Sequence, residues 1–488
     1  MSGEDRPVGD RAFDGDRRRY ARQIDRLNEL GPRRPGSPAH HALVDEIASD
    51  LAALGYTVQR DTHRFERWDA TPSRTALTVG ERHVEVSSSW PYSGETGPAG
   101  VTAPLVLLTG RRRKWTRARG RIAVIEVHNV DAPASLLLDS WGGPLPFDRT
   151  ANPAISSEFA GTDLSGARAA GVLGVVAIWR DLPDDEARDQ YLPFTRPHQG
   201  IPAVWVPASQ GDELAAAARR GERATLTLDA TRHPDAAMDT VWAVAPGSGP
   251  HAHESVIVVT HSDGGNAVEE NGHIGLLALA RDASSIPHDR TIVFVFVAGH
   301  LRIPAVTTHG QATSAWLDAH PDLWSPTTPG LTAVAGLAVE HLGARRRRED
   351  TTSAGAENPA EPELVYATTR ELDALTRTLW NGAGPVRPVR PGALIHLGEG
   401  EPLFERSIPA VALVTGPTFL LAETSAAGVD LDLLARQIDS FGILLRRLAN
   451  APDASAFGTV RHAGRAKRIV ASVRVAWFMI RSSRRAKA

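Results

Sequence analysis

The chain has 488 residues, of which 42% are hydrophobic and 23% charged, and this balance predicts a globular protein of two or three domains. The formal net charge of −3 excludes a generally positive electrostatic potential that would attract polyanions, so we expect no nucleic-acid partner. The absence of cysteine excludes disulfides, cysteine nucleophiles and thiolate metal sites. A metal ion would need His, Asp, Glu or water ligands, which favours zinc, manganese, magnesium or calcium over softer metals.

The two ends of the chain are polar and carry no targeting segment that we recognise. Residues 1–35 are charged and lack an apolar stretch, so we predict a polar N-terminal segment, no signal peptide and a cytoplasmic protein. Residues 451–488 are expected to form a basic tail whose apolar run 469–480 is too short to span a bilayer. A surface helix on lipid, a helix docked on the protein and a disordered tail all remain open, as does homo-oligomerisation.

The first structured part is expected at residues 36–79. Ser37 and Pro38 are typical of a helix start, and apolar residues recur on one face of that helix before Gly55 ends it. Residues 80–232 show a different pattern, with short predicted strands and frequent turns. Strands are predicted over 103–108, 120–125, 172–178, 201–206 and 225–228, and helices over 164–171 and 210–220.

From residue 238 to residue 450 strands and helices alternate. The predicted strands are 255–260, 291–297, 332–340 and 409–415, and the predicted helices are 272–283, 309–319, 369–380 and 430–449. Such alternation predicts an α/β fold with a largely parallel sheet and helices on both faces. In such sheets ligands bind at the carboxyl ends of the strands. Arg345 to Pro362 is expected to be a charged loop, and the basic run Arg111 to Lys114 another.

Metal-binding residue types follow the core strands where each strand ends. They are His261 and Asp263, then Glu269 and Glu270, then His300, then Glu340, and finally Glu399 and Glu401 in a later loop. Three or four such ligands with an open position are typical of a catalytic zinc site, and an acid beside a ligand often orients it. A histidine at a strand end is also common at protein surfaces, and acids before a helix also offset its dipole. Because side chains alternate along a strand, His341 is expected to face away from Glu340.

Several soft motifs, in this order and spacing, resemble one family. They are Leu30 to Arg33 with Gly36-Ser37, Gly166 to Ile178 with Ile201-Pro202, Val258 to Asp263, Asn271-Gly272, Ala280-Arg281 and Ile408-Pro409. The chain resembles the zinc aminopeptidase and carboxypeptidase family that includes glutamate carboxypeptidase II and the transferrin receptor. The resemblance covers roughly residues 25–450. It implies a zinc-exopeptidase core with a β-rich protease-associated domain inserted at 80–232.

The resemblance also implies a ligand set, and this chain departs from it. The family holds two metals with a first His, a bridging Asp, a Glu, a second Asp and a last His. His261 matches the first His and Asp263 its accompanying Asp, which we expect to orient His261. Either Glu269 or Glu270 stands at the bridging Asp.

The remaining family positions are altered more strongly. The family's Glu-Glu pair falls on Gly299 and His300, so the general base is missing while His300 could still bind. Glu340 stands at the second Asp. The last His falls near Gly400, where Glu399 or Glu401 is the available substitute.

These substitutions leave one metal position credible, with His261, Glu270 and Glu340, and weaken the other. We therefore expect one zinc ion or none. A general base commonly contributes about 10²- to 10⁴-fold to a rate, so its loss at Gly299 matters. Two functions stay open: a divergent metal-dependent hydrolase of peptide or small amide bonds, and a non-catalytic binding protein that keeps the peptidase fold.

Overall fold

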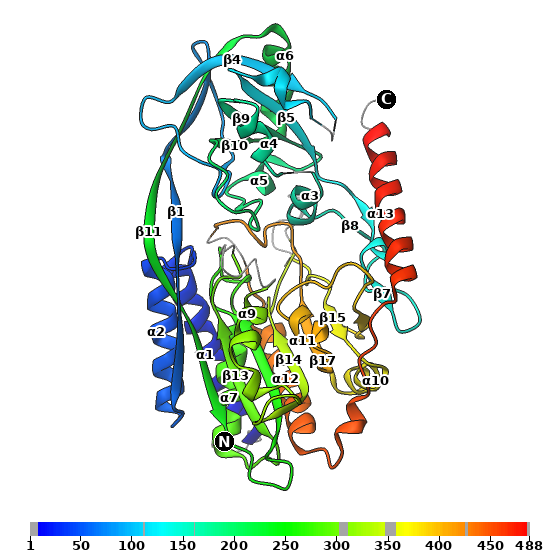
Figure 1. The fold of residues 1–488 in the computed structure, drawn as a ribbon. Helices are drawn as coiled ribbons and strands as arrows, with labels where there is room; N and C mark the ends of the chain where they lie inside the picture. The colour runs from blue at the N-terminus through cyan, green and yellow to red at the C-terminus, as the bar shows by residue number, and fades with distance from the viewer. Residues whose placement is uncertain are drawn as a thin grey trace, which may run out of the picture.

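The computed structural model describes residues 8–110, 113–160, 162–301, 311–346, 358–424 and 428–485. These residues form two lobes along one continuous sheet (Figure 1). Parts of three predicted segments lie outside the described residues: the run at 111–114, the start of the helix at 309–319 and much of the loop at 345–362.

The lower lobe in Figure 1 is built on four parallel strands in the order β13-β12-β14-β17. Antiparallel strands flank them, β11 beside β13 and β15 beside β17. Buried strands of parallel sheets are covered on both faces and therefore read as continuous apolar runs. The bounds are β11 Arg223–Ala245, β12 Glu254–His261, β13 Thr291–Val297, β14 Thr332–Val339, β15 Leu364–Ala367, β16 Val389–Arg390 and β17 Ala410–Val414.

Helices cover both faces of this sheet, as the alternating pattern predicts. One face packs against α1 Val8–Leu30, α2 Pro38–Ala53, α7 Gly272–Ser285, α10 Arg370–Leu379 and α12 Leu431–Asn450. The other face packs against α9 Ala312–Ala319 and α11 Glu401–Glu405. The predicted α/β fold with a largely parallel sheet is confirmed, and the helices and strands predicted after residue 238 all occur within a few residues of their expected bounds.

The upper lobe continues the sheet through β4, β5, β9 and β10, which are mutually parallel, with β3 at the edge. Its strands are β2 Arg82–Val84, β3 Ser88–Ser89, β4 Val101–Leu108, β5 Ile122–His128, β9 Gly174–Arg180 and β10 Ala203–Val206. Between β5 and β9, β7 Asp139–Ser140 pairs with β16 at the edge of the lower sheet, and β6 Ala132–Pro133 and β8 Arg149–Thr150 form a separate two-stranded sheet. Its helices are α3 Pro153–Phe159, α4 Ser165–Ala169, α5 Asp184–Ala187 and α6 Ala208–Arg220. Strands and helices occur where the sequence predicts them between 80 and 232.

Two long antiparallel strands join the lobes, β1 Val58–Val79 and β11. They run side by side along the left edge of the molecule in Figure 1. The sequence predicted only a short piece of β11, at 225–228. The middle of each strand connects the two lobes and is largely exposed, so it carries charged residues in place of the alternating apolar residues by which a strand is recognised in a sequence.

The terminal segments are more ordered than their polar composition suggests. Within the polar N-terminal segment, Val8–Leu30 forms α1, which buries Tyr20, Ile24 and Leu27 against the lower lobe. The basic tail forms α13 Arg465–Arg485, which stands beside the upper lobe with Ile469, Val473 and other apolar side chains more than half exposed (Figure 1). Among the described helices, none is long and apolar enough to cross a bilayer.

Candidate metal centre

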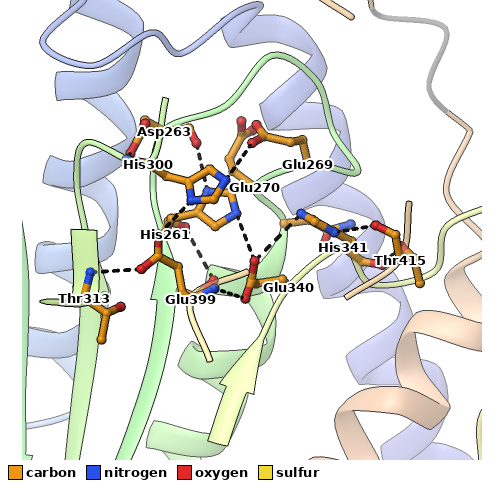
Figure 2. Close-up of polar contacts among 12 residues, drawn as sticks. His261, Asp263, Glu269, Glu270, His300, Thr313, Glu340, His341, Glu399 and Thr415 are labelled. Carbon is orange, nitrogen blue, oxygen red and sulfur yellow. Dashed lines mark hydrogen bonds and ion pairs between the residues drawn. The ribbon is translucent and has the colours of Figure 1, made fainter. Parts of the chain in front are cut away.

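The predicted ligands meet at the carboxyl edge of the lower sheet. His261 is the last residue of β12 and pairs with Val297, the last residue of β13, so His300 follows three residues beyond the same edge. Glu340 follows β14, which is the other neighbour of β12. Figure 2 shows these side chains pointing toward one another, with Glu399 and Glu269 beside them. Because β12 pairs in parallel with β13 and β14, the carboxyl ends of all three strands lie together at one edge of the sheet.

His261, Glu340 and His341 form the first group. The Nε2 atom of His261 lies 3.8 Å from Glu340 Oε2, and the Nε2 atom of His341 lies 4.0 Å from the same oxygen. All three side chains are buried, and none of these three atoms has a hydrogen-bond partner. A metal ion could bind all three, because their ligand atoms lie within 4.8 Å of one another.

The position of His341 differs from the sequence-based expectation. Alternation along a strand puts neighbours on opposite faces, but β14 ends at Val339, one residue before Glu340. His341 then adopts the left-handed conformation with φ of 54°. This turn of the backbone brings the imidazole to the same side as Glu340, so the expectation that His341 faces away is wrong.

His261, Glu269 and His300 form the second group of possible ligands. The imidazoles of His261 and His300 stack with ring centres 4.2 Å apart, and His300 Nε2 lies 4.0 Å from Glu269 Oε1. The other Glu269 oxygen accepts a hydrogen bond from the backbone N–H of Gly265 at 2.9 Å. The two groups share His261.

Asp263 supports the site in a different way from the one expected. Its main-chain carbonyl, not its carboxylate, accepts the Nδ1–H of His261 at 2.9 Å. The carboxylate accepts backbone N–H groups of Gly299 at 2.7 Å, His300 at 3.1 Å and Leu301 at 2.6 Å. Asp263 therefore orients His261 through the backbone and holds the loop that carries His300.

Glu269 and Glu270 separate into different environments. The Glu270 carboxylate is paired with the Arg33 guanidinium, and both side chains are fully buried. Among the described residues Glu270 belongs to neither ligand group, so the expected set of His261, Glu270 and Glu340 does not form. Gly264 lets both carboxylates approach, because a Cβ there would overlap an oxygen of each.

Glu399 and Glu401 also take separate places. Glu399 accepts the Nδ1–H of His300 at 2.7 Å and the backbone N–H of Thr313 at 2.9 Å, so it orients His300. Glu401 accepts a hydrogen bond from Gln311 at 3.2 Å. Neither acid is a member of the two ligand groups within the part of the chain that the structure describes.

Burial shifts the pKa values of His261, His341 and Glu340. It lowers the pKa of His261 well below its usual range, and the nearby His300 lowers it further. Burial lowers the pKa of His341 to about 3. Both imidazoles are therefore neutral near pH 7 and keep a lone pair for a ligand. Burial raises the pKa of Glu340 to about 8, against the opposing effect of His300.

His300 titrates differently from its neighbours. Burial acts to lower its pKa, but the hydrogen bond and charge of Glu399 outweigh burial and raise the pKa of His300 to about 10. Burial raises the pKa of Glu269 well above its usual range. Burial also raises the pKa of Glu270 to about 7, with Arg33 opposing the shift. Without a bound cation these buried acids hold protons more strongly than free acids do.

A cavity of about 620 Å³ opens beside the cluster. Its floor includes Glu269, Gly299, His300, Glu340 and His341. Its walls come from both lobes and are largely apolar; they include Leu137, Ile155, Phe159, Phe194, Ile395 and Leu397. Cavities of this size with convergent polar groups are typical of small-molecule sites.

The residues present fit a divalent metal ion. Unpaired buried polar atoms are rare in proteins, yet His261 Nε2, Glu269 Oε1, Glu340 Oε2 and His341 Nε2 are all buried without a partner. Nitrogen and carboxylate donors of this kind are those that zinc accepts. Sequence reasoning found all of these residues except His341 as candidate ligands. It noted Arg33 only as part of a motif and did not find its pairing with Glu270.

No protein-family model matches the chain, and no curated protein sequence matches it. Solved structures do match. The M28 peptidase precursor of Shewanella amazonensis has a TM-score of 0.61 and 14% identity, covering 93% of this chain and 99% of that one. The zinc aminopeptidase of Bacillus subtilis has a TM-score of 0.57 and 18% identity, covering 91% and 98%. An aminopeptidase from Aneurinibacillus has a TM-score of 0.58 and 17% identity, covering 88% and 94%.

These matches extend over nearly the whole of both chains and therefore include the upper lobe. At such identities they establish the fold. The finer resemblance to glutamate carboxypeptidase II and the transferrin receptor, and the assignment of residues 80–232 as a protease-associated domain, remain predictions. The chain has the fold of the zinc aminopeptidases and M28 peptidases.

Proposed function

We propose that the protein is a metal-dependent hydrolase that cleaves peptide or small amide bonds, with zinc as its metal. One observation carries the proposal: buried, unpartnered nitrogen and carboxylate atoms around His261 converge at the floor of a cavity large enough for a small substrate. The fold, which the chain shares with zinc aminopeptidases, supports the same reaction class.

A bound divalent ion would polarise the substrate carbonyl and lower the pKa of a water molecule. The protein residues supply binding and orientation. The apolar walls of the cavity would hold the substrate's side chain and exclude water, while His300 lies at the floor with its Nδ1–H held by Glu399. Gly299 supplies no side chain, so another group must accept the proton of the attacking water.

Glu269 is the carboxylate that we assign to this proton transfer. It lines the cavity, and its Oε1 atom has no hydrogen-bond partner, whereas Arg33 binds Glu270 and His300 binds Glu399. A Glu269→Gln variant is expected to keep its metal and to lose about 10²- to 10⁴-fold in kcat, the usual contribution of a general base. Steady-state kinetics together with elemental analysis would measure both. Loss of the metal in this variant would instead make Glu269 a ligand.

The hydrolase proposal is tested with the purified full chain and a panel of dipeptides, aminoacyl anilides and N-acyl amino acids. We expect cleavage of at least one class, detected by mass spectrometry of the products. A chelator should abolish the cleavage, and zinc or manganese should restore it. A protein that holds stoichiometric metal and cleaves none of these compounds would contradict the proposal.

A second function, a binding protein on a peptidase scaffold, is favoured by one observation. Gly299 stands at the family's base position. In addition, Glu270 pairs with Arg33 and Glu399 pairs with His300, so these two acids are engaged within the protein and less available to a second ion. Under this alternative the cavity would bind a peptide or amide without turnover. Equilibrium binding of an uncleaved panel compound, with no product after prolonged incubation, would support it.

A further inference from the structure

Three atoms at the neighbouring ends of β12 and β14 form a ligand set that the family pattern does not contain. His261 Nε2 and His341 Nε2 face the same oxygen of Glu340, at 3.8 and 4.0 Å. Two ligands about 2.0–2.2 Å from one tetrahedral ion lie about 3.4 Å apart. Both distances to Glu340 exceed this value by a few tenths of an ångström, and the three atoms all lie within 4.8 Å of one another, so modest side-chain shifts would bring them onto one ion (Figure 2).

The hydrogen bonds around these atoms direct each of them toward the same point. His261 donates its Nδ1–H to the Asp263 carbonyl at 2.9 Å, and His341 donates its Nδ1–H to the Thr415 carbonyl at 2.7 Å. Each imidazole therefore presents Nε2 as a lone pair. Glu340 Oε1 accepts the backbone N–H of Glu399 at 2.7 Å, which leaves Oε2 for the ion. Such outer partners are typical of metal-ligating histidines and carboxylates.

The second group, His261, Glu269 and His300, is less suited to a metal ion. His300 lies between two carboxylates, with Nδ1 at 2.7 Å from Glu399 and Nε2 at 4.0 Å from Glu269. Both groups also need His261, whose Nδ1 is already engaged, so one lone pair is available to complete only one of them. Glu269 Oε1 also lacks a hydrogen-bond partner, but it shares His300 with Glu399, whereas Glu340 Oε2 faces two imidazole nitrogens at 3.8 and 4.0 Å.

We propose that His261, Glu340 and His341 hold a single divalent metal ion, with His341 as the third protein ligand, while Arg33 and His300 pair with the acids left around it. Two histidines and one glutamate with an open position form a known type of catalytic zinc site. The proposal deepens the proposed hydrolase function and rests on it for the identity of the reaction, although the metal site is testable by itself.

The test measures metal binding rather than turnover. His341→Asn is the informative variant, because asparagine tolerates the left-handed conformation that His341 adopts. His300→Asn is the matched variant from the second group. Zinc stoichiometry is measured by elemental mass spectrometry and affinity by competition with a chromogenic chelator, with circular dichroism to verify folding. The absorption spectrum of the Co²⁺-loaded protein reports the ligand set.

The native chain is expected to bind one zinc ion. His341→Asn should weaken binding by at least about 100-fold, more than the 10- to 100-fold typical of losing an outer partner, and change the Co²⁺ spectrum. His300→Asn should weaken it by no more than that outer-partner range. Two ions per chain, no ion at all, or a loss of affinity in His300→Asn that exceeds the loss in His341→Asn would each overturn the proposal.

Failure of the metal proposal differs from failure of the function. If zinc binds through other residues and amides are still cleaved, the ligand assignment is wrong and the hydrolase stands. If His341 proves to be a ligand and the panel is not cleaved, the site stands and the hydrolase proposal falls.

Discussion

A Glu340→Gln variant is expected to purify without stoichiometric zinc and to lose amide hydrolysis by more than about 100-fold, beyond the effect of losing an outer partner. The amide has nearly the shape of the carboxylate but cannot become an anionic ligand, and Glu340 is fully buried with its Oε2 atom facing the neutral imidazoles of His261 and His341. Elemental analysis and initial rates on a cleaved panel compound would measure the two losses.

The same variant should remain folded. In the metal-free protein burial raises the pKa of Glu340 to about 8, so the carboxyl group is largely neutral near pH 7, and Gln is neutral too while its oxygen still accepts the Glu399 N–H. The metal-free variant should therefore melt no lower than the metal-free native protein. Glu401→Gln is the control, because Glu401 lies at the start of α11 and bonds Gln311. Retained zinc in Glu340→Gln, or equal loss in Glu401→Gln, would contradict the assignment.

An Arg33→Met variant is expected to lower the free energy of unfolding by about 3–5 kcal/mol, the usual effect of breaking a buried ion pair. Arg33 and Glu270 are both buried, and the guanidinium also donates to the main-chain carbonyl of Leu27 at 2.6 Å. Removing the cation leaves the Glu270 charge without a partner and releases the end of α1. Denaturant unfolding followed by tryptophan fluorescence would measure the change.

A double variant separates the charge effect from the loss of packing. Arg33→Met with Glu270→Gln should recover most of the loss, because no buried charge remains. Arg60→Met is the control, since Arg60 pairs with Asp45 and Asp239 at the surface, where such pairs contribute about 0–1 kcal/mol. If Arg33→Met alone unfolds like the native chain, the pair does not stabilise the site as described.

Local patterns in the sequence were sufficient to predict the parallel core of the lower lobe and the helices that alternate with its strands. Apolar runs such as Thr291–Val297 and the helical face of 430–449 specify strand and helix directly, because the period of buried residues follows from backbone geometry. Alternation of the two then implies parallel strands whose carboxyl ends meet. His261, His300 and Glu340 follow such strand ends, and they do lie at one edge of one sheet.

The tertiary structure decided how the side chains face one another at that edge. Whether Glu269 or Glu270 turns toward His300 depends on Arg33, which lies 237 positions away in the chain. His341 joins Glu340 because the strand has ended and the backbone has turned to a positive φ. Periodicity applies only within a regular element, and beyond its last residue long-range contacts set the direction of each side chain. The sequence alone therefore determined which strand ends gather at the site, and only the folded chain decided which of their side chains are free to bind a metal ion.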